Sequence, residues 1–212
     1  MIDVRPESLS AAESYKLLVG IVVPRPIAWV TTRNADGGVN LAPFSCYTFV
    51  SSEPPMVAIS IGRRDGVAKD TSRNAQRAGE FVVNVVDESQ AMPMHLSSAE
   101  HPADASEAEI NGVTLAPSIT VATPRVAAAP IALECRLDQV IPFGRLKTDL
   151  VIGEVTLFRI ADALYRAGKV DSIAMKPLAR LGGPNYARLG EILTLPTVGE
   201  AGPGSRAPGA RA

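Results

Sequence analysis

Short β-prone runs, separated by turn residues and with few long helical segments between them, most constrain what this 212-residue chain can fold into. Residues 27–32, 56–61 and 81–86 are runs of this kind, rich in branched and aromatic side chains. A doubly wound parallel sheet needs long helical crossovers between its strands, and these are missing. The pattern predicts a closed or nearly closed antiparallel barrel, with an open α+β sandwich as the alternative.

Two longer runs, residues 131–141 and 150–160, extend the pattern. In the first, apolar side chains share one face at period two, which predicts a strand with one buried side. They belong to Ile131, Leu133, Cys135, Leu137 and Ile141. Residues 34–38 read Asn-Ala-Asp-Gly-Gly and predict a hairpin turn. Pro43 interrupts the return strand, which indicates a bulge or a strand at the sheet edge.

Charge and composition exclude several classes of partner. Lys and Arg total 21 against 22 for Asp and Glu, so no basic field is available for nucleic acid or an anionic membrane. Aromatic residues make up only 5%, too few for base-stacking platforms. The longest apolar stretch is shorter than a membrane span, and the charged N-terminus does not resemble a signal peptide. We therefore expect a cytoplasmic protein.

The cysteines and histidines give no support for a metal site. Cys46 and Cys135 form no Cys-x-x-Cys motif, and in a reducing cytoplasm we expect free thiols rather than a disulfide. His95 and His101 are six residues apart, which places them on different faces of a helix. We predict no bound metal.

The sequence predicts one domain, residues 1–196, followed by a tail. Ser10, with Glu13 three residues later, is typical of a capping box at the start of a short N-terminal helix. Residues 197–212 contain four Gly, two Pro and four Ala. A segment of this composition has nothing to bury, so we expect it to be disordered.

One segment has the chemistry of a phosphate site. Lys69, Asp70 and Thr71 lie where a short helix is predicted to begin, with Asp70 as its N-cap. A helix N-terminus presents unpaired N–H groups and partial positive charge, to which Lys69 adds a full charge and Thr71 a hydroxyl donor. The alternative is an ordinary capped surface helix.

Two further segments suit a flat aromatic ligand. The stretch from Asn40 through Phe44 and Ser45 is bent by proline, which frees backbone groups for the edge of a heteroaromatic ring. Arg180 and Tyr186, in the glycine-rich residues 177–187, are suited to stacking on such a ring. The alternatives are a bulged edge strand and a plain connection.

In combination and in order, five blocks resemble the flavin reductase-like family of FMN-binding split-barrel proteins. They read RPIAWVTT from Arg25, NLAPFS from Asn40, SEPPMVAIS from Ser52, KDT from Lys69 and GEFVVN from Gly79. The late PLARLGG segment is similar to a motif of one branch of that family, which also includes flavoredoxins and flavoprotein oxygenases. The resemblance covers roughly residues 10–195.

The resemblance implies a mainly β fold: an antiparallel, Greek-key-like split β-barrel with a few short helices. It also implies a homodimer with FMN, rather than FAD, near the subunit interface. The implied cofactor-binding residues are Thr31, Thr32, Phe44, Ser45, Cys46, Ser60, Ile61, Gly62, Lys69, Asp70, Thr71, Arg180 and Tyr186. Phe44 to Cys46 would hold the ring edge, Ser60 to Gly62 the ribityl chain, and Lys69 to Thr71 the phosphate.

The implied activity is an FMN-dependent oxidoreductase that moves hydride from NADH or NADPH to flavin. The electrons then pass to free flavin, a partner oxygenase or another acceptor, and no side chain need act as an acid or base. Many NAD(P)H-dependent members carry a histidine where this chain has Lys147, Thr148 and Asp149. An electron-transfer flavoprotein without its own nicotinamide site is therefore one alternative, and a flavoprotein oxygenase is another.

Overall fold

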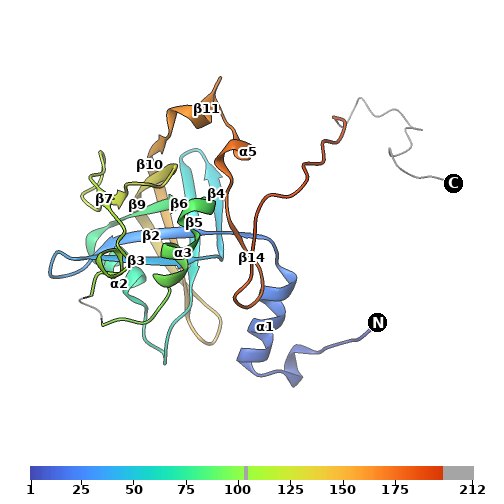
Figure 1. Cartoon of the computed structure of the whole chain (residues 1–212). Helices are drawn as coiled ribbons and strands as arrows, with labels where there is room; N and C mark the ends of the chain where they lie inside the picture. Colours follow the sequence, from blue (N-terminus) through green and yellow to red (C-terminus); the bar gives the residue numbers. More distant parts are fainter. Residues whose placement is uncertain (103–104, 198–212) are drawn as a thin grey trace.

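One seven-stranded antiparallel sheet dominates the computed structural model, which describes residues 1–102 and 105–197 (Figure 1). Its strands are β2 (Ala28–Arg33), β3 (Val39–Phe44), β4 (Tyr47–Ser52), β5 (Pro55–Ile61), β6 (Glu80–Val85), β9 (Ile131–Phe143) and β10 (Thr148–Ile160). Across the sheet they run in the order β3-β2-β6-β9-β10-β5-β4. The expected mainly β, antiparallel fold is confirmed.

The two end strands of this sheet, β3 and β4, are separated along the chain by only Ser45 and Cys46. So short a link spans about 10 Å at most, which means that the sheet must curl until its ends meet. The backbone N–H of Ser60 on β5 then donates to the carbonyl of Cys46 (2.8 Å). The sheet is therefore a barrel that opens beside β3, the end strand in which Pro43 is tolerated.

The barrel interior is filled from every strand of the sheet. Phe81 and Ile59 are about 1% exposed and pack with branched side chains of β2, β9 and β10. Gly153 on β10 makes room for the Phe81 ring, because a Cβ built on it would lie 2.5 Å from the Phe81 Cζ. A larger residue at position 153 would have to displace the ring.

An outer layer covers β2 and β3 on the side away from the barrel interior (Figure 1). It consists of α3 (Ala91–Leu96), α4 (Glu107–Ile110) and the short strands β7 (Leu115–Ala116) and β8 (Arg125–Val126). Trp29 is fully buried there, and its indole N–H donates to the Ser97 hydroxyl (2.9 Å). Helix α2 (Asp70–Ala78) instead packs on β2, β3 and β6 and ends at Gly79, which adopts φ 71°.

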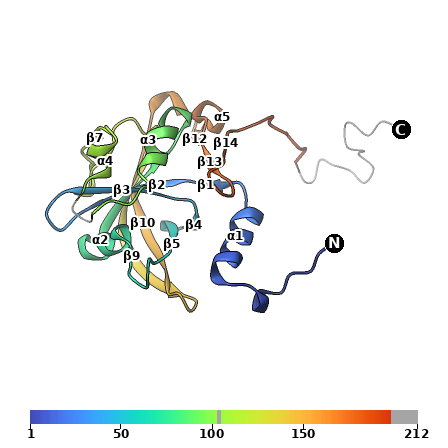
Figure 2. The same cartoon turned by 60° about the horizontal axis from the view of Figure 1, so that its bottom comes forward.

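A third group of elements lies at one side of the barrel, where Figure 2 shows α1 next to β1, β13 and β14. Helix α1 (Ala11–Ile21) starts with the predicted capping box of Ser10 and Glu13. The strands β1 (Arg25–Pro26), β13 (Ala179–Arg180) and β14 (Tyr186–Ala187) form a small antiparallel sheet. The remaining elements are β11 (Tyr165–Arg166), β12 (Lys169–Val170), α5 (Ser172–Met175) and three 3₁₀ turns at Pro6–Ser8, Glu88–Gln90 and Asp162–Leu164.

The period-two prediction for β9 fails at its far end. Gln139 pairs with Ile152 while Leu137 pairs with Gly153, so Asp138 is an extra, bulged residue. The bulge reverses which side chains face inward, and Val140, not Ile141, packs against the barrel core.

The predicted disordered tail, residues 197–212, lies outside the described residues apart from Thr197. Within the described part of the chain, no helix has both the length and the apolar character needed to cross a membrane.

Candidate functional site

The start of α2 forms the centre of the candidate site. The structure corrects the predicted cap: Lys69, with extended backbone, occupies the N-cap position, and Asp70 is the first helical residue and pairs with Arg73. Lys69 supplies no side-chain cap. The N–H groups of Asp70, Thr71 and Ser72 have no hydrogen-bond partner within residues 1–102 and 105–197. This helix therefore presents three free donors at its positive end.

Lys69 differs from the other cations around this helix start. Arg63 pairs with Asp149 (2.7 Å), Arg64 with Glu100 (2.6 Å) and Arg73 with Asp70. No carboxylate of the described residues lies within 4.0 Å of the Lys69 ammonium, which instead lies 6.0 Å from the centre of the Phe44 ring.

The Lys69 residue is exposed, but neighbouring groups partly desolvate its ammonium. This desolvation lowers the pKa of Lys69 from its ordinary value, and the neighbouring positive charge of Arg64 lowers it further while Glu100 opposes both. A bound anion would compensate for the missing negative charge, so the donor set fits a phosphate group.

A buried amide network lies behind the helix start. The Asn40 side-chain amide on β3 donates to the hydroxyls of Thr71 (3.0 Å) and Thr32 (3.3 Å). The Asn74 amide also donates to Thr32 (3.3 Å). Thr71 is 3% exposed, and because its oxygen accepts from Asn40, its own hydroxyl proton remains able to donate to another acceptor. This network joins three predicted or candidate residues from β2, β3 and α2.

The bend between β3 and β4 lies beside the start of α2 and forms another part of the candidate site. Phe44 and Ser45 are half-buried and Cys46 is exposed, with its carbonyl accepting from Ser60. Since Phe44 also lies next to the Lys69 ammonium, the predicted ring-edge, ribityl and phosphate residues are brought together in one region.

Four predicted residues present no accessible side chain to this region. Thr31 is fully buried, and its hydroxyl donates to the Pro124 carbonyl (2.6 Å) on the outer-layer side of β2. Ile61 is 1% exposed with its side chain in the barrel core, and Gly62, which follows it, is exposed. Thr32 is also fully buried, and its hydroxyl accepts from the Asn40 and Asn74 amides, so neither threonine presents an exposed side chain to a ligand.

Arg180 and Tyr186 form a cluster of their own. They are cross-strand partners on β13 and β14, with the guanidinium 4.5 Å from the Tyr186 ring centre and donating to its hydroxyl. The same hydroxyl lies 2.9 Å from Nδ1 of His95, on α3. The Nδ1 atom of His95 therefore has a phenol partner from the late segment.

Two residues outside the predicted set make hydrogen bonds that hold the β3–β4 bend and the start of α2. Arg25 is 6% exposed and donates from Nε to the Ser45 hydroxyl (3.2 Å). Asp149 is 2% exposed and accepts from both Arg63 and the Ser72 hydroxyl (2.9 Å). A charged residue between two prolines, and one at the start of an apolar strand, are the signals that could have revealed them.

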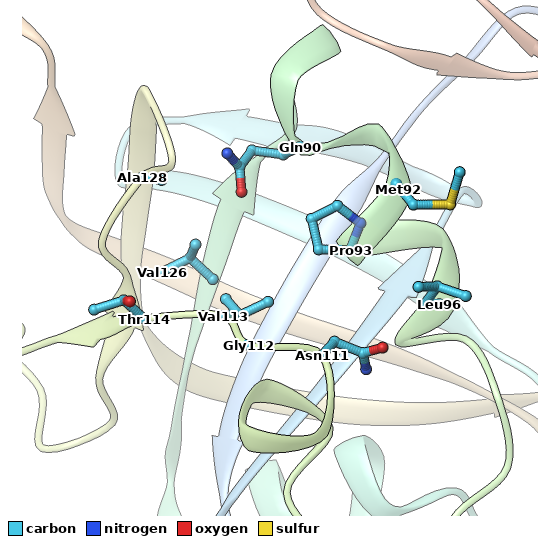
Figure 3. Close-up of a pocket in the computed structure, with 10 residues that line it drawn as sticks. All are labelled: Gln90, Met92, Pro93, Leu96, Asn111, Gly112, Val113, Thr114, Val126 and Ala128. Atoms are coloured by element: carbon cyan, nitrogen blue, oxygen red, sulfur yellow. The ribbon is translucent and has the colours of Figure 1, made fainter.

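A groove of about 410 Å³ lies away from these residues, between α3, the segment after α4, and β8 (Figure 3). Its lining consists of Gln90, Met92, Pro93, Leu96, Asn111, Gly112, Val113, Thr114, Val126 and Ala128. None of the predicted cofactor-binding residues is among them. The groove therefore belongs to the outer layer and not to the candidate site.

Comparison with known proteins identifies the family. The model of the flavin reductase like domain matches residues 20–174. The chain belongs to the flavin reductase-like family. A relative from Halalkalibacterium halodurans, BH2278, is 45% identical over 206 residues, which cover 94% of this chain and 99% of the relative. The resemblance read from the sequence blocks is thus confirmed.

Two solved structures show how closely flavin reductase-like proteins share this fold. Nitrilotriacetate monooxygenase component B from Bacillus cereus is 39% identical, with a TM-score of 0.90 over 92% of this chain and 98% of its own. The 2-nitrobenzoate 2-nitroreductase NbaA of Pseudomonas fluorescens is 36% identical, with a TM-score of 0.84 over 92% and 97%. The fold is the split barrel of this family, and membership supports a flavin as the cofactor.

Proposed function

We propose that this chain is an FMN-dependent oxidoreductase that takes hydride from NADH or NADPH and delivers electrons to a second acceptor. The observation that carries the proposal is the Lys69 ammonium beside three N–H groups of α2, all without a partner among the described residues, within reach of the exposed bend after Phe44. A cytoplasmic location, where both nicotinamides are available, is part of the proposal.

The residues of the chain bind and orient the cofactor rather than react. Lys69, Thr71 and the first N–H groups of α2 would hold the phosphate, with Asn40 fixing the Thr71 hydroxyl. The backbone of residues 44–46 and 60–62 would bind the ring edge and the ribityl chain. The flavin, when bound, supplies the redox chemistry by accepting hydride and releasing electrons. FMN rather than FAD follows the family resemblance.

The proposed acceptor is free flavin or a partner oxygenase. The similar Bacillus cereus protein is named as component B of a monooxygenase, which supports a supply of reduced flavin to a separate oxygenase component. The named activity of the Pseudomonas fluorescens relative, reduction of 2-nitrobenzoate, supports an oxidoreductase that uses a flavin.

One observation favours a second candidate, an electron-transfer flavoprotein without its own nicotinamide site. The tip of the β9–β10 hairpin carries Arg145 and Lys147, and β10 begins with Thr148 and Asp149. None of these is the histidine that the family resemblance leads us to expect. Asp149, moreover, is engaged by Arg63 and Ser72.

We also propose that the functional unit is a homodimer. No residue of α1 is fully buried, and Tyr15, Leu18 and Ile21 are 63%, 60% and 74% exposed. Cys46, Gly62 and Lys69 are exposed as well, so one copy leaves the proposed site open on one side. A second copy would cover apolar surface and enclose the cofactor.

Absorption spectroscopy tests the proposal directly. Purified protein should carry a flavin spectrum, and the flavin released by heat should co-elute with FMN. Anaerobic addition of NADH or NADPH should then bleach the flavin. Bound FMN without bleaching would select the electron-transfer candidate, and no binding of added FMN or FAD would refute both.

A further inference from the structure

Arg25 makes an unusual set of hydrogen bonds. Its guanidinium donates to four acceptors on three separate segments: the carbonyls of Val19 (2.6 Å) and Val22 (2.7 Å), the carbonyl of Leu181 (2.9 Å) and the hydroxyl of Ser45 (3.2 Å). The residue is 6% exposed, and no carboxylate of the described residues lies within 4.0 Å of it. Burying a charge is costly unless hydrogen bonds compensate for the lost water, and for Arg25 these four bonds provide that compensation.

Two of these acceptors end helix α1. Val19 and Val22 lie in its last turn and at its C-cap, where carbonyls lack partners within the helix and the dipole is negative. Helix α1 buries no residue of its own, so apolar packing does not fix it on the barrel. Arg25 therefore provides the main polar anchor of α1 in this structure.

The Leu181 carbonyl brings in the late segment. Gly182, the next residue, packs directly on the end of α1: a Cβ built on it would lie 3.8 Å from Gly20 Cα and 3.9 Å from the Val19 carbonyl. Arg180 is also the cross-strand partner of Arg25. The helix end, the β13–β14 loop and Arg25 therefore form one contact region, and Figure 2 shows α1, β1, β13 and β14 together beside the barrel.

The fourth acceptor links this region to the proposed flavin site, since Ser45 lies in the bend that would hold the ring edge. We propose that Arg25 is a positioning residue that fixes this bend through Ser45 and couples its geometry to the seating of α1 and the 181–183 loop. This inference rests on the proposed function. Arg25 itself would not contact the cofactor.

A double-mutant cycle tests the coupling. FMN titrations would compare the unsubstituted chain with Arg25→Lys, Ser45→Ala and the combined variant. Lysine keeps the charge but cannot reach all four acceptors. We expect Arg25→Lys to weaken FMN binding about five- to ten-fold when Ser45 is present and less than about two-fold when it is alanine. Equal weakening in both backgrounds, or none in either, would overturn the proposal.

Arg33→Lys is the matched control. Arg33 lies at the other end of the same run of β structure and also donates from its side chain to a backbone carbonyl, that of Ala122 (3.0 and 2.8 Å). It should leave FMN affinity unchanged. Hydrogen exchange adds a second measurement: Arg25→Lys should speed exchange of the Val22 amide at the end of α1, and Arg33→Lys should not.

NMR spectroscopy gives a test that needs no substitution at Arg25, so it applies even if the Arg25 variants do not fold. The Arg25 Nε–H resonance of the otherwise intact protein should shift on FMN binding and on Ser45→Ala, whereas the Arg33 Nε–H resonance should not. An Arg25 resonance insensitive to FMN would overturn the inference. Failure of the unsubstituted chain to bind FMN is a separate result, and it would refute the proposed function first.

Discussion

Ser72, in the first turn of α2, donates a hydrogen bond to Asp149 at the start of β10, with 2.9 Å between the two oxygens. The same carboxylate accepts from Arg63, which directly follows the exposed Gly62. One buried acid thus holds both the helix start proposed for the phosphate and the segment proposed for the ribityl chain. Its removal should affect stability and cofactor binding together.

Asp149→Asn tests this relationship. The amide keeps the shape but leaves the partly buried Arg63 cation without a counter-charge, which should destabilise the fold by about 3 kcal/mol. FMN affinity should fall with it. Ser72→Ala removes only the neutral donor and should cost about 1 kcal/mol. Urea unfolding and FMN titration measure both effects, and an Asp149→Asn protein as stable as the parent would contradict this account.

Lys69→Ala tests the phosphate site. A charge-assisted hydrogen bond contributes about 1.5–3 kcal/mol, so FMN affinity should fall ten-fold or more. Riboflavin has no phosphate, and its affinity should hardly change. Lys169→Ala, on the peripheral strand β12, is the control and should alter neither affinity. Equal losses for FMN and riboflavin would place Lys69 away from the phosphate.

Gly153→Ala tests how the barrel interior is filled. The new Cβ would lie 2.5 Å from the Phe81 ring, and this overpacking should cost about 1–3 kcal/mol of unfolding free energy. The loss should shrink when Phe81 is leucine, because the smaller side chain leaves room. Gly20→Ala meets no atom within 4 Å and should not destabilise the fold. A Gly153→Ala penalty that is independent of residue 81 would argue against this contact.

The sequence predicted the architecture well because short β-prone runs and missing crossovers leave few folds open. The capping box at Ser10 and the αL glycine at position 79 are local signals, and both are present. The Asp138 bulge was missed because strand register depends on the partner strand and not on local pattern. Asp70 was misread as an N-cap because its side chain pairs with Arg73 instead.

The residues of the candidate site are harder to predict from the sequence than the fold is. Lys69 and Thr71 stood out because their chemistry matches a helix start. Arg25 and Asp149 reach the candidate site through Ser45 and Ser72, which lie 20 and 77 positions away in the sequence, so no spacing rule finds them. The alternation along β9 places Glu134 on the face opposite Cys135, yet Glu134 is fully buried because the loop at residues 119–120 folds over it.

The loss of stability caused by Glu134→Gln should therefore depend on pH. Burial raises the pKa of Glu134, but hydrogen bonds from Thr120 and Ile119, with the positive charge of Arg159, outweigh burial and lower the pKa overall. A depressed folded-state pKa stabilises the fold above the unfolded pKa, and this contribution is lost as the pH falls through the folded value. The substitution should cost about 1–3 kcal/mol at neutral pH.

Stability measurements at acidic pH check this prediction. Urea unfolding of Glu134→Gln and the parent should differ at pH 7 and converge as the pH drops below the usual range of a carboxyl group. Glu154→Gln is a control on the neighbouring strand, because no described group makes a side-chain hydrogen bond or ion pair with it. A Glu134→Gln penalty that does not depend on pH would mean that shape rather than charge matters at this position.

The last prediction joins assembly to cofactor binding. The proposed site is open where Cys46 and Lys69 are exposed, and α1 presents uncovered apolar side chains at Tyr15 and Leu18. If a second copy covers both, Leu18→Glu should weaken the dimer and release FMN as the protein is diluted. Ile173→Glu, on α5, changes an equally exposed apolar residue and should do neither.

Mass action gives this prediction a second consequence. A ligand that binds the dimer and not the separated chains must stabilise the dimer, so added FMN should raise the melting temperature and make it depend on protein concentration. Light scattering with and without FMN measures the assembly directly. A stable monomer of about 22.3 kDa that holds FMN at full stoichiometry would refute the dimer. In that case the open side of the site would face solvent, and the affinity for FMN would rest on one copy of Lys69 and its neighbours.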